Sequence, residues 1–355
     1  MRIRFGILGT AHIANRVADA IESSGHQVYA IASRDLERAK QWVSGRTSNK
    51  DDIICYGSYD QLIEDDQVQA VYIPLPSSLA DCWAQRAANS GKHILVDKPF
   101  SSAENVLQIT QLCRRNNLAF LDGTQFVHGP RLKEMQNMIQ SGAIGRLRKV
   151  NAAFTAWIVD STNIRYDPSL EPAGCVGDVG WYVVRFILSF VGYDRKVISV
   201  YAVGNETDHG AMDDCCGVVQ FEDNITAHFD CGFTSGYRQW GECLGTLGMF
   251  RVDRFQGAPI PNSSEQKDPN LHFQFRQVGE ERNGRIERVE KETKDIWVPS
   301  VGKPQSVLLI EQFVTLIEKQ DKEEREKWAK EAWKTQLLVD AIYQSAKTKQ
   351  TILLL

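Results

Sequence analysis

Three side chains stand out as candidates for chemistry, namely Lys98, Asp178 and Tyr182. Lys98 follows the apolar run HILV, which predicts a buried strand with a cation at its carboxyl end, where open α/β sheets bind their ligands. Asp178 and Tyr182 are four residues apart, so on a helix they would project from one face toward a shared point. A carboxylate and a phenol with one target suit acid and base catalysis. An exposed acid and a half-buried tyrosine on an amphipathic helix would show the same spacing.

A regular alternation of strands and helices surrounds Lys98 and continues to about residue 126. Amphipathic helices are predicted between the strands, and this order is typical of a parallel sheet with dinucleotide-binding topology. We therefore expect Lys98 at the junction of a dinucleotide-binding half and a second half of different composition. The predicted strands are RIRFGIL, QVYAIASR, ICYG, QAVYIPL, HILV and LAFL.

The first turn of this half matches a phosphate-binding loop only in part. Gly9, Ala11 and Ala14 stand where the pattern GxGxxG has glycines, so the motif is weak alone and also fits an ordinary strand-to-helix turn. In a dinucleotide fold, the proline-containing turn 74–76 would be extended and would pass under the cofactor. Cofactor contacts are expected from Gly9, Thr10, Ala11, His12, Ile13, Pro74, Leu75 and Pro76.

The end of the second predicted strand indicates which dinucleotide is preferred. Ser33 and Arg34 stand where such folds place the residue that reads the adenosine ribose, and neither is an acid. A hydroxyl and a guanidinium suit a 2′-phosphate, and Arg38 follows one helical turn later. These residues favour NADP, with NAD possible. Both arginines would also fit a solvated helix start.

The second half has a different pattern of predicted elements, with successive strands of alternating polarity from Val197 to about Val289. Short polar turns between them predict a large, open and mostly antiparallel sheet. An apolar outer face on such a sheet would need a partner, so we expect a homodimer or homotetramer. The predicted domains are 1–124, which binds NADP, and 125–355, which binds substrate and oligomerises; the C-terminal helices could pack back on the first domain.

Between these halves, a helix is predicted to begin at Pro172 and Gly174 and to carry Asp178 and Tyr182. Its glycines at positions 174, 177 and 180 are tolerable if another surface, such as a nicotinamide ring or the other domain, approaches the backbone closely. Arg185 is expected to be a salt-bridge partner or a residue at the rim of the pocket.

The bulk composition excludes several classes of partner. The 355 residues carry a net charge of -4, which provides no basic field for nucleic acid or an anionic membrane. No apolar run reaches the roughly 20 residues of a membrane span, and Met1 leads directly into a strand, which favours the cytoplasm. Eight scattered cysteines and seven histidines lack ligand spacing, so no metal site is expected.

Taken in order, seven motifs resemble the glucose-fructose oxidoreductase, inositol dehydrogenase and rhizopine catabolism (Gfo/Idh/MocA) family over essentially the whole chain. The resemblance implies an N-terminal Rossmann domain, a C-terminal domain with a large open sheet, and NAD(P)-dependent oxidation or reduction of sugars, cyclic polyols or related carbonyls. The motifs are GILGTAHIA, AIASRDLERA, VYIPLPSSL, GKHILVDKPF, DGTQFVHGPR, NIRYDP and GDVGWY.

The resemblance also assigns residues. The family's EKP motif corresponds to Asp97-Lys98-Pro99, and its aspartate and later histidine correspond to Asp178 and Tyr182, where tyrosine is similar to the glucose-fructose oxidoreductase and dihydrodiol dehydrogenase branch. Ser77 and Ala80 replace the family's usual asparagine and histidine. Asp97, Lys98, Gln125 and Arg165 are further expected cofactor contacts, and His128, Trp157 and Tyr182 are expected to contact substrate.

These assignments predict hydride transfer between the nicotinamide and a carbinol or carbonyl carbon. Tyr182 would exchange the hydroxyl proton, Lys98 would lower its pKa and polarise the reacting oxygen, and Asp178 would orient substrate or Lys98. Two other functions fit the same fold, a regulator that binds NADP without catalysis and an NAD-dependent glycosidase. The sequence leaves the substrate open.

Overall fold

The computed structural model describes the chain except residues 1, 47–51, 257–270, 283, 290 and 355. It forms two compact units, each assembled from separate stretches of the chain. Unit 1 comprises Met1–Gln125, Ser169–Pro172 and Pro304–Gln336, and unit 2 comprises Phe126–Pro168, Ala173–Lys303 and Leu337–Leu355.

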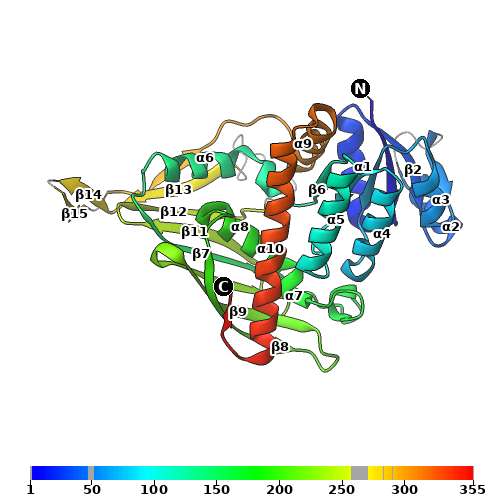
Figure 1. Cartoon of the computed structure of the whole chain (residues 1–355). Coiled ribbons are helices and arrows are strands. Elements are labelled where there is room, and N and C mark those ends of the chain that lie inside the picture. Colours follow the sequence, from blue (N-terminus) through cyan, green and yellow to red (C-terminus); the bar gives the residue numbers. More distant parts are fainter. Residues whose placement is uncertain (1, 47–51, 257–270, 283, 290, 355) are drawn as a thin grey trace. The chain divides into compact units, whose positions relative to one another are not determined.

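Unit 1 contains a six-stranded parallel sheet of order β3-β2-β1-β4-β5-β6. The chain winds outward from β1 in one direction and then from β4 in the other, so the order reverses between these two strands, which is where Rossmann folds bind dinucleotides. The predicted fold of this half is therefore confirmed (Figure 1). The strands are β1 (Arg4–Leu8), β2 (Gln27–Ala32), β3 (Ile54–Tyr56), β4 (Ala70–Ile73), β5 (His93–Val96) and β6 (Phe120–Asp122).

The helices of this unit begin where the sequence supplies capping side chains. The side chains of Asp35, Ser58 and Ser102 accept hydrogen bonds from backbone N–H groups in the first turns of α2, α3 and α5. Helices α4 and α5 lie against each other, as do α1 and α9 (Figure 1). The bounds are α1 (His12–Ser23), α2 (Leu36–Ser44), α3 (Tyr59–Glu64), α4 (Ser77–Asn89), α5 (Ala103–Arg115) and α9 (Gln305–Lys319).

Unit 2 is built on a nine-stranded sheet of order β16-β13-β12-β11-β7-β10-β9-β8-β17, as the alternating pattern predicts. Its described pairs are antiparallel except that β10 runs parallel to β7. Its strands are β7 (Leu147–Thr155), β8 (Val197–Glu206), β9 (Met212–Phe221), β10 (Ile225–Gly232), β11 (Arg238–Gly245), β12 (Gly248–Asp253), β13 (His272–Gln277), β16 (Lys294–Trp297) and β17 (Ile352–Leu353).

Helix α8 (Val179–Val191) covers one face of this sheet and packs against β7 and β10. Arg185 on α8 is fully buried, and its guanidinium carbon lies 5.4 Å from the ring centroid of Tyr193. The expected rim position for Arg185 is therefore wrong, because α8 is apolar nearly all round and buries every side of its middle turns. The remaining helices are α6 (Pro130–Gln140), α7 (Gly174–Gly177), α10 (Lys322–Thr348) and the short 3-10 turns η2 (Phe126–His128), η3 (Ile164–Tyr166) and η4 (Glu222–Asn224).

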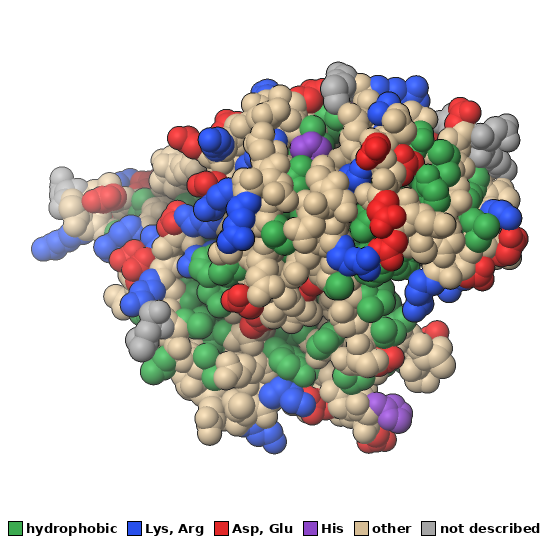
Figure 2. Space-filling view, turned by 45° about the vertical axis from the view of Figure 1, so that its right-hand side comes forward, with side chains coloured by type: hydrophobic (Ala, Val, Ile, Leu, Met, Phe, Trp, Pro, Cys, Tyr) green, Lys and Arg blue, Asp and Glu red, His purple; other side chains and the backbone are tan. Residues whose placement is uncertain are grey.

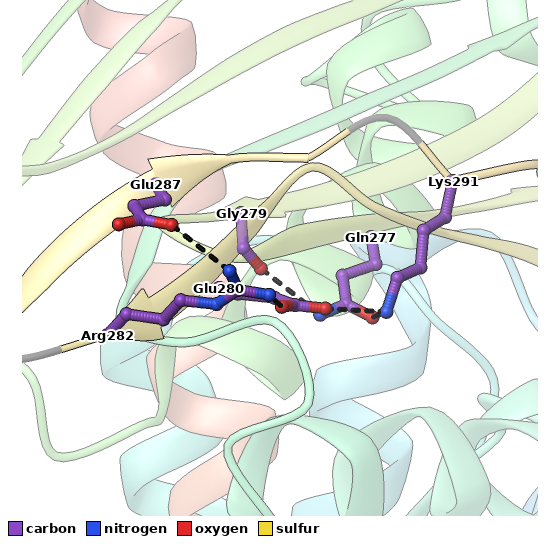
Figure 3. A network of polar contacts seen from close by, with 6 residues as sticks. All are labelled: Gln277, Gly279, Glu280, Arg282, Glu287 and Lys291. Atoms are coloured by element: carbon purple, nitrogen blue, oxygen red, sulfur yellow. Dashed lines mark hydrogen bonds and ion pairs between the residues drawn. The ribbon is translucent and has the colours of Figure 1, made fainter.

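A separate hairpin of β14 (Gly279–Arg282) and β15 (Arg285–Arg288) extends beyond the ends of β12 and β13 (Figure 1). Lys291 donates to Glu280 over 2.6 Å, and Arg282 bridges Glu280 and Glu287, so charged side chains connect its strands (Figure 3). Lys291 and Arg282 lower the pKa of Glu280. Because Lys291, Arg282 and Glu287 are exposed, the network contributes little to stability.

The surface carries charges of both signs. On the face in Figure 2, lysines and arginines are interspersed with aspartates and glutamates, in keeping with the small net charge of -4. None of the helices in the described part of the chain has the length and hydropathy needed to cross a membrane.

Candidate active site

Gly9 shapes the turn between β1 and α1 in unit 1. Its φ is +100°, and a Cβ there would lie 2.8 Å from Cδ2 of Leu75, so a larger residue would disturb both the backbone and the neighbouring turn. Helix α1 then starts at His12 with no side-chain cap and no acid in its first turn. Its first N–H groups and its dipole therefore suit a bound anion such as a pyrophosphate.

The end of β2 gathers the residues that were predicted to read the ribose. Ser33 is 4% exposed and its hydroxyl accepts from the Asp35 N–H, whereas Arg34 and Arg38 are exposed. Both guanidinium groups lower the pKa of one neighbour, the phenol of Tyr59. The two arginines of the β2–α2 segment thus lie beside a tyrosine from the next strand-to-helix connection.

Tyr59 was not predicted as a site residue. It begins α3 after β3 and lies near the guanidinium groups of Arg34 and Arg38. Burial raises the pKa of Tyr59, and the two nearby arginines oppose that rise. Its ring meets that of Trp83 edge-on at 4.9 Å. The only sequence signal for Tyr59 was its place directly after a predicted strand that neighbours β2.

The proline turn between β4 and α4 is anchored by a residue that the sequence analysis also missed. The Ser77 hydroxyl donates to Oε2 of Glu171 over 2.8 Å, and the Ser77 N–H donates to Oε1 over 3.3 Å. The Ser78 N–H donates to the Leu170 carbonyl over 3.2 Å. Glu171 therefore supplies the acid that caps α4, where the turn itself has none.

Lys98 lies two residues beyond the end of β5 and is half-buried. Its neighbour Asp97 accepts a hydrogen bond of 2.7 Å from the Tyr72 hydroxyl, and a Cβ at Gly123 would collide with the other carboxylate oxygen. On the other side, the Phe100 N–H donates to Oε1 of Gln336 over 3.1 Å. The backbone around Lys98 is therefore fixed at both ends.

In unit 2, the predicted single helix from Pro172 is wrong, because α7 ends at Gly177 and α8 begins at Val179. Asp178 separates them with φ −81° and ψ −78°. A Cβ at Gly174 would collide with the Met212 carbonyl, and one at Gly180 would lie 3.1 Å from Sγ of Cys231. Within this unit, the surfaces that require these two glycines are strands β9 and β10 rather than a nicotinamide ring.

Asp178 and Arg165, which were predicted for different roles, form an ion pair in unit 2. Nε of Arg165 donates to Oδ2 of Asp178 over 2.5 Å. The Asn163 side chain accepts from the Arg165 N–H over 3.1 Å and caps the turn η3 that carries the arginine. The Asp178 side chain is 15% exposed, and Arg165 places a positive charge against its carboxylate.

Tyr182 lies in the first turns of α8 within a group of aromatic rings. Its ring centroid is 5.7 Å from that of Phe154 and 6.4 Å from that of Phe126, and neither phenylalanine was predicted at the site. His128 is half-buried in η2, and Trp157 is 70% exposed just beyond β7. Lys98 belongs to unit 1, whereas Asp178 and Tyr182 belong to unit 2, and their joint action stays a prediction.

Comparison with known proteins adds evidence for both halves of the chain. Residues 3–123 match the model of an oxidoreductase family with an NAD-binding Rossmann fold, and residues 132–251 match the model of the GFO/IDH/MocA C-terminal domain. The D-xylose 1-dehydrogenase (NADP(+)) 2 of Haloferax volcanii is 32% identical over 253 residues, which cover 70% of this chain and 75% of that protein. The dTDP-3,4-didehydro-2,6-dideoxy-α-D-glucose 3-reductase of Saccharopolyspora spinosa is 31% identical over 259 residues, which cover 71% of this chain and 75% of that protein.

Among solved structures, a 3-ketoreductase from Actinomadura kijaniata in complex with NADP and TDP-benzene has a TM-score of 0.81 and 26% identity. The match covers 97% of this chain and 98% of that one. Two variants of the same ketoreductase, one with a tyrosine replaced by phenylalanine and one with a lysine replaced by alanine, match with TM-scores of 0.82 and 0.79.

Proposed function

Because this chain belongs to the Gfo/Idh/MocA oxidoreductase family, we propose that it is an NADP-preferring dehydrogenase or reductase of a sugar, polyol or related small molecule. One observation carries the catalytic part of the proposal. The lysine and the tyrosine substituted in the Actinomadura kijaniata ketoreductase are separated by as many residues as Lys98 and Tyr182 are here.

The cofactor preference rests on unit 1. The Gly9 turn and the uncapped start of α1 fit a pyrophosphate, and Ser33, Arg34 and Arg38 would bind the 2′-phosphate that distinguishes NADP from NAD. The xylose dehydrogenase relative is named as NADP-dependent, and the ketoreductase was crystallised with NADP. When bound, the nicotinamide supplies or accepts the hydride.

The chain's own residues would handle the proton and the charge. Tyr182 exchanges the proton of the reacting hydroxyl, and because a phenol in water titrates near 10, it needs a cation to act near neutrality. Lys98 provides that cation and stabilises negative charge on the reacting oxygen. Asp178, already paired with Arg165, positions the start of α8 and hence Tyr182 rather than carrying a proton.

Sugar-related substrates are favoured by the relatives. One acts on D-xylose and another on a deoxyglucose attached to dTDP, as their names state. Both reactions interconvert a hydroxyl and a carbonyl, which is the chemistry that a phenol and a lysine can assist. A regulator without catalysis would have no need of these two side chains.

Purified Lys98→Ala and Tyr182→Phe proteins test this proposal directly. Each should lower turnover of a reactive sugar by two or more orders of magnitude, since general acid–base catalysis contributes about 10²–10⁴-fold, while NADPH is still bound. Tyr193→Phe, on the same segment but beyond α8, is the matched control and should keep full turnover. Unchanged turnover in both active-site variants would remove the assignment, and tighter binding of NAD than of NADP would remove the cofactor preference.

The outer face of the nine-stranded sheet, opposite α8, supports the expected homo-oligomer. Tyr201, Val203 and Val218 on β8 and β9 are 47%, 45% and 40% exposed. Tyr201 pairs with Val218 across the strands, so the apolar side chains are contiguous. Glu242 and Arg251 on β11 and β12 add both signs of charge to this face. A two-fold interface places one surface against itself, and a face with both signs can be self-complementary.

A further inference from the structure

Arg254 adopts an uncommon backbone conformation at the end of β12. Its φ is +54°, in the left-handed region that residues with side chains rarely occupy. Such conformations persist only where the surrounding structure imposes them, and they are concentrated at functional sites.

Two buried groups hold the Arg254 backbone in place. Arg131, which is 4% exposed, donates from Nη2 to the carbonyl oxygens of Arg254 and Phe255 over 2.8 and 2.9 Å, and from Nη1 to that of His272. The Arg254 N–H donates to the Gln239 carbonyl over 2.7 Å. The position of Arg254 is fixed by a second arginine whose own donors are used on the backbone.

The Arg254 side chain has no counter-charge in the described part of the chain. Its Nε is buried and has no hydrogen-bond partner among the described residues. Its guanidinium carbon lies 5.8 Å from the ring centroid of Tyr237, which is 54% exposed. Nearby Arg238 and Arg251 are paired with Asp230 and Asp253. Buried donors without acceptors are rare in folded proteins, so this arrangement suits an anionic ligand that accepts from the guanidinium.

Aromatic contacts connect this arginine to Tyr182 along two routes within unit 2. The Tyr237 ring is 6.1 Å from that of Phe154, which lies 5.7 Å from Tyr182. On the other route, Phe255 directly follows Arg254, and its ring is 5.5 Å from that of Phe126, which lies 6.4 Å from Tyr182. On each route a single phenylalanine ring, that of Phe154 or Phe126, therefore lies between Tyr182 and the next aromatic ring beside Arg254.

We propose that Arg254 and Tyr237 form a subsite for a phosphoryl group attached to the sugar, so that the substrate is a phosphorylated sugar rather than a free one. This inference rests on the proposed function. A guanidinium is the best protein group for a phosphate, because its planar fork matches two phosphate oxygens. The phosphoryl group can belong to a simple sugar phosphate or to a sugar nucleotide, whose base could stack on the exposed Tyr237 ring.

Calorimetric titration of the full chain with NADP bound tests the subsite, using D-glucose, D-glucose 1-phosphate and dTDP-D-glucose as probes. At least one phosphorylated probe should bind ten or more times more tightly than D-glucose. Arg254→Gln should abolish that advantage without changing D-glucose binding, and Arg254→Lys should keep part of it. Arg251→Gln, an arginine that also lies over an aromatic ring but has an acidic partner, should leave the advantage intact.

The probes distinguish the two sources of phosphate. Equal affinity for both phosphorylated probes indicates a sugar phosphate, whereas tight binding of dTDP-D-glucose alone, weakened by Tyr237→Leu, indicates a sugar nucleotide. The inference is overturned if neither phosphorylated probe binds better than D-glucose, or if Arg254→Gln weakens all three probes equally.

Cofactor absorbance separates this inference from the proposed function. Turnover of free sugars with no preference for phosphate would leave the oxidoreductase intact and remove the subsite. Binding of phosphorylated probes through Arg254 without reduction or oxidation of the cofactor by any sugar would retain the subsite and remove the oxidoreductase.

Discussion

At the scale of single residues, Asp178 shows how a predicted catalytic group depends on a partner. Its carboxylate accepts a hydrogen bond from Arg165, which is 13 positions earlier in the chain. Asp178 also stands between α7 and α8, so the junction of these two helices determines the direction in which its side chain projects. If the pair acts as a unit, substitution of either the aspartate or the arginine should remove the contribution of both.

A double-mutant cycle with Asp178→Asn and Arg165→Gln tests this dependence. Each single substitution should lower kcat/KM, and the double substitution should lower it little further, which gives a coupling of about 1 kcal/mol. The value should be near the lower end of such couplings because the Arg165 side chain is 39% exposed and is screened by solvent. Losses that simply add would mean that Asp178 acts independently, for example on the substrate.

Sequence alone could single out Asp178 and Tyr182, because their spacing is local. It could not find Arg254, whose significance lies in a positive φ and in the absence of a counter-charge within the described structure. Nor could it join Tyr59 to Arg34, because that contact depends on the packing of β3 beside β2. These features arise from non-local packing, for which a single sequence carries no periodic signal.

At the scale of elements, strand β5, which precedes Lys98 in the chain, makes the stability of the fold depend on pH. His93 begins the strand, and its Nδ1 accepts a hydrogen bond of 2.9 Å from the N–H of Ala119, the residue before β6. Burial and the nearby Arg325 lower the pKa of His93 from 6.5 to about 4. The folded protein thus requires a neutral ring at this position.

The free energy of unfolding should therefore fall as the pH is lowered. A depressed folded-state pKa stabilises the protein above the unfolded value near 6.5, and this contribution is lost between about pH 6.5 and 4. The loss is at most about 3 kcal/mol. Urea unfolding at several pH values should show a shallower dependence for His93→Gln than for the native protein, while His209→Gln, at an exposed turn, should keep the native slope. Equal slopes in all three proteins would contradict this account.

The elements themselves were largely predictable from periodicity. Alternation of strands and helices up to residue 126 indicated the parallel sheet, and short alternating runs indicated the second sheet. The parallel pairing of β10 with β7 was not predictable, because the two strands are far apart in sequence. The break at Asp178 was also missed, since α7 and α8 together show a nearly continuous apolar pattern.

At the scale of the whole molecule, the outer face of the larger sheet should control assembly. Val218→Asp would place a charge in the middle of the apolar cluster formed with Tyr201 and Val203, and we expect the oligomer to dissociate to a monomer. Light scattering after gel filtration would measure the change in mass. Val159→Asp, which alters a hydrophobic side chain that is 76% exposed and not on the sheet, is the control and should leave the mass unchanged. A native monomer would rule out the interface.

The segment Ser169–Pro172 has a practical consequence for anyone who wishes to divide the protein. It belongs to unit 1 and caps α4 through Glu171, yet the residues on both sides of it belong to unit 2. Helix α9 likewise returns to α1 from more than two hundred positions later in the chain. A truncation after Gln125 would deprive the nucleotide-binding part of both supports. Chimeras with other members of the family should therefore exchange all the stretches of a unit together. No single cut in the gene separates unit 1 from unit 2, because each unit is assembled from three stretches of the chain.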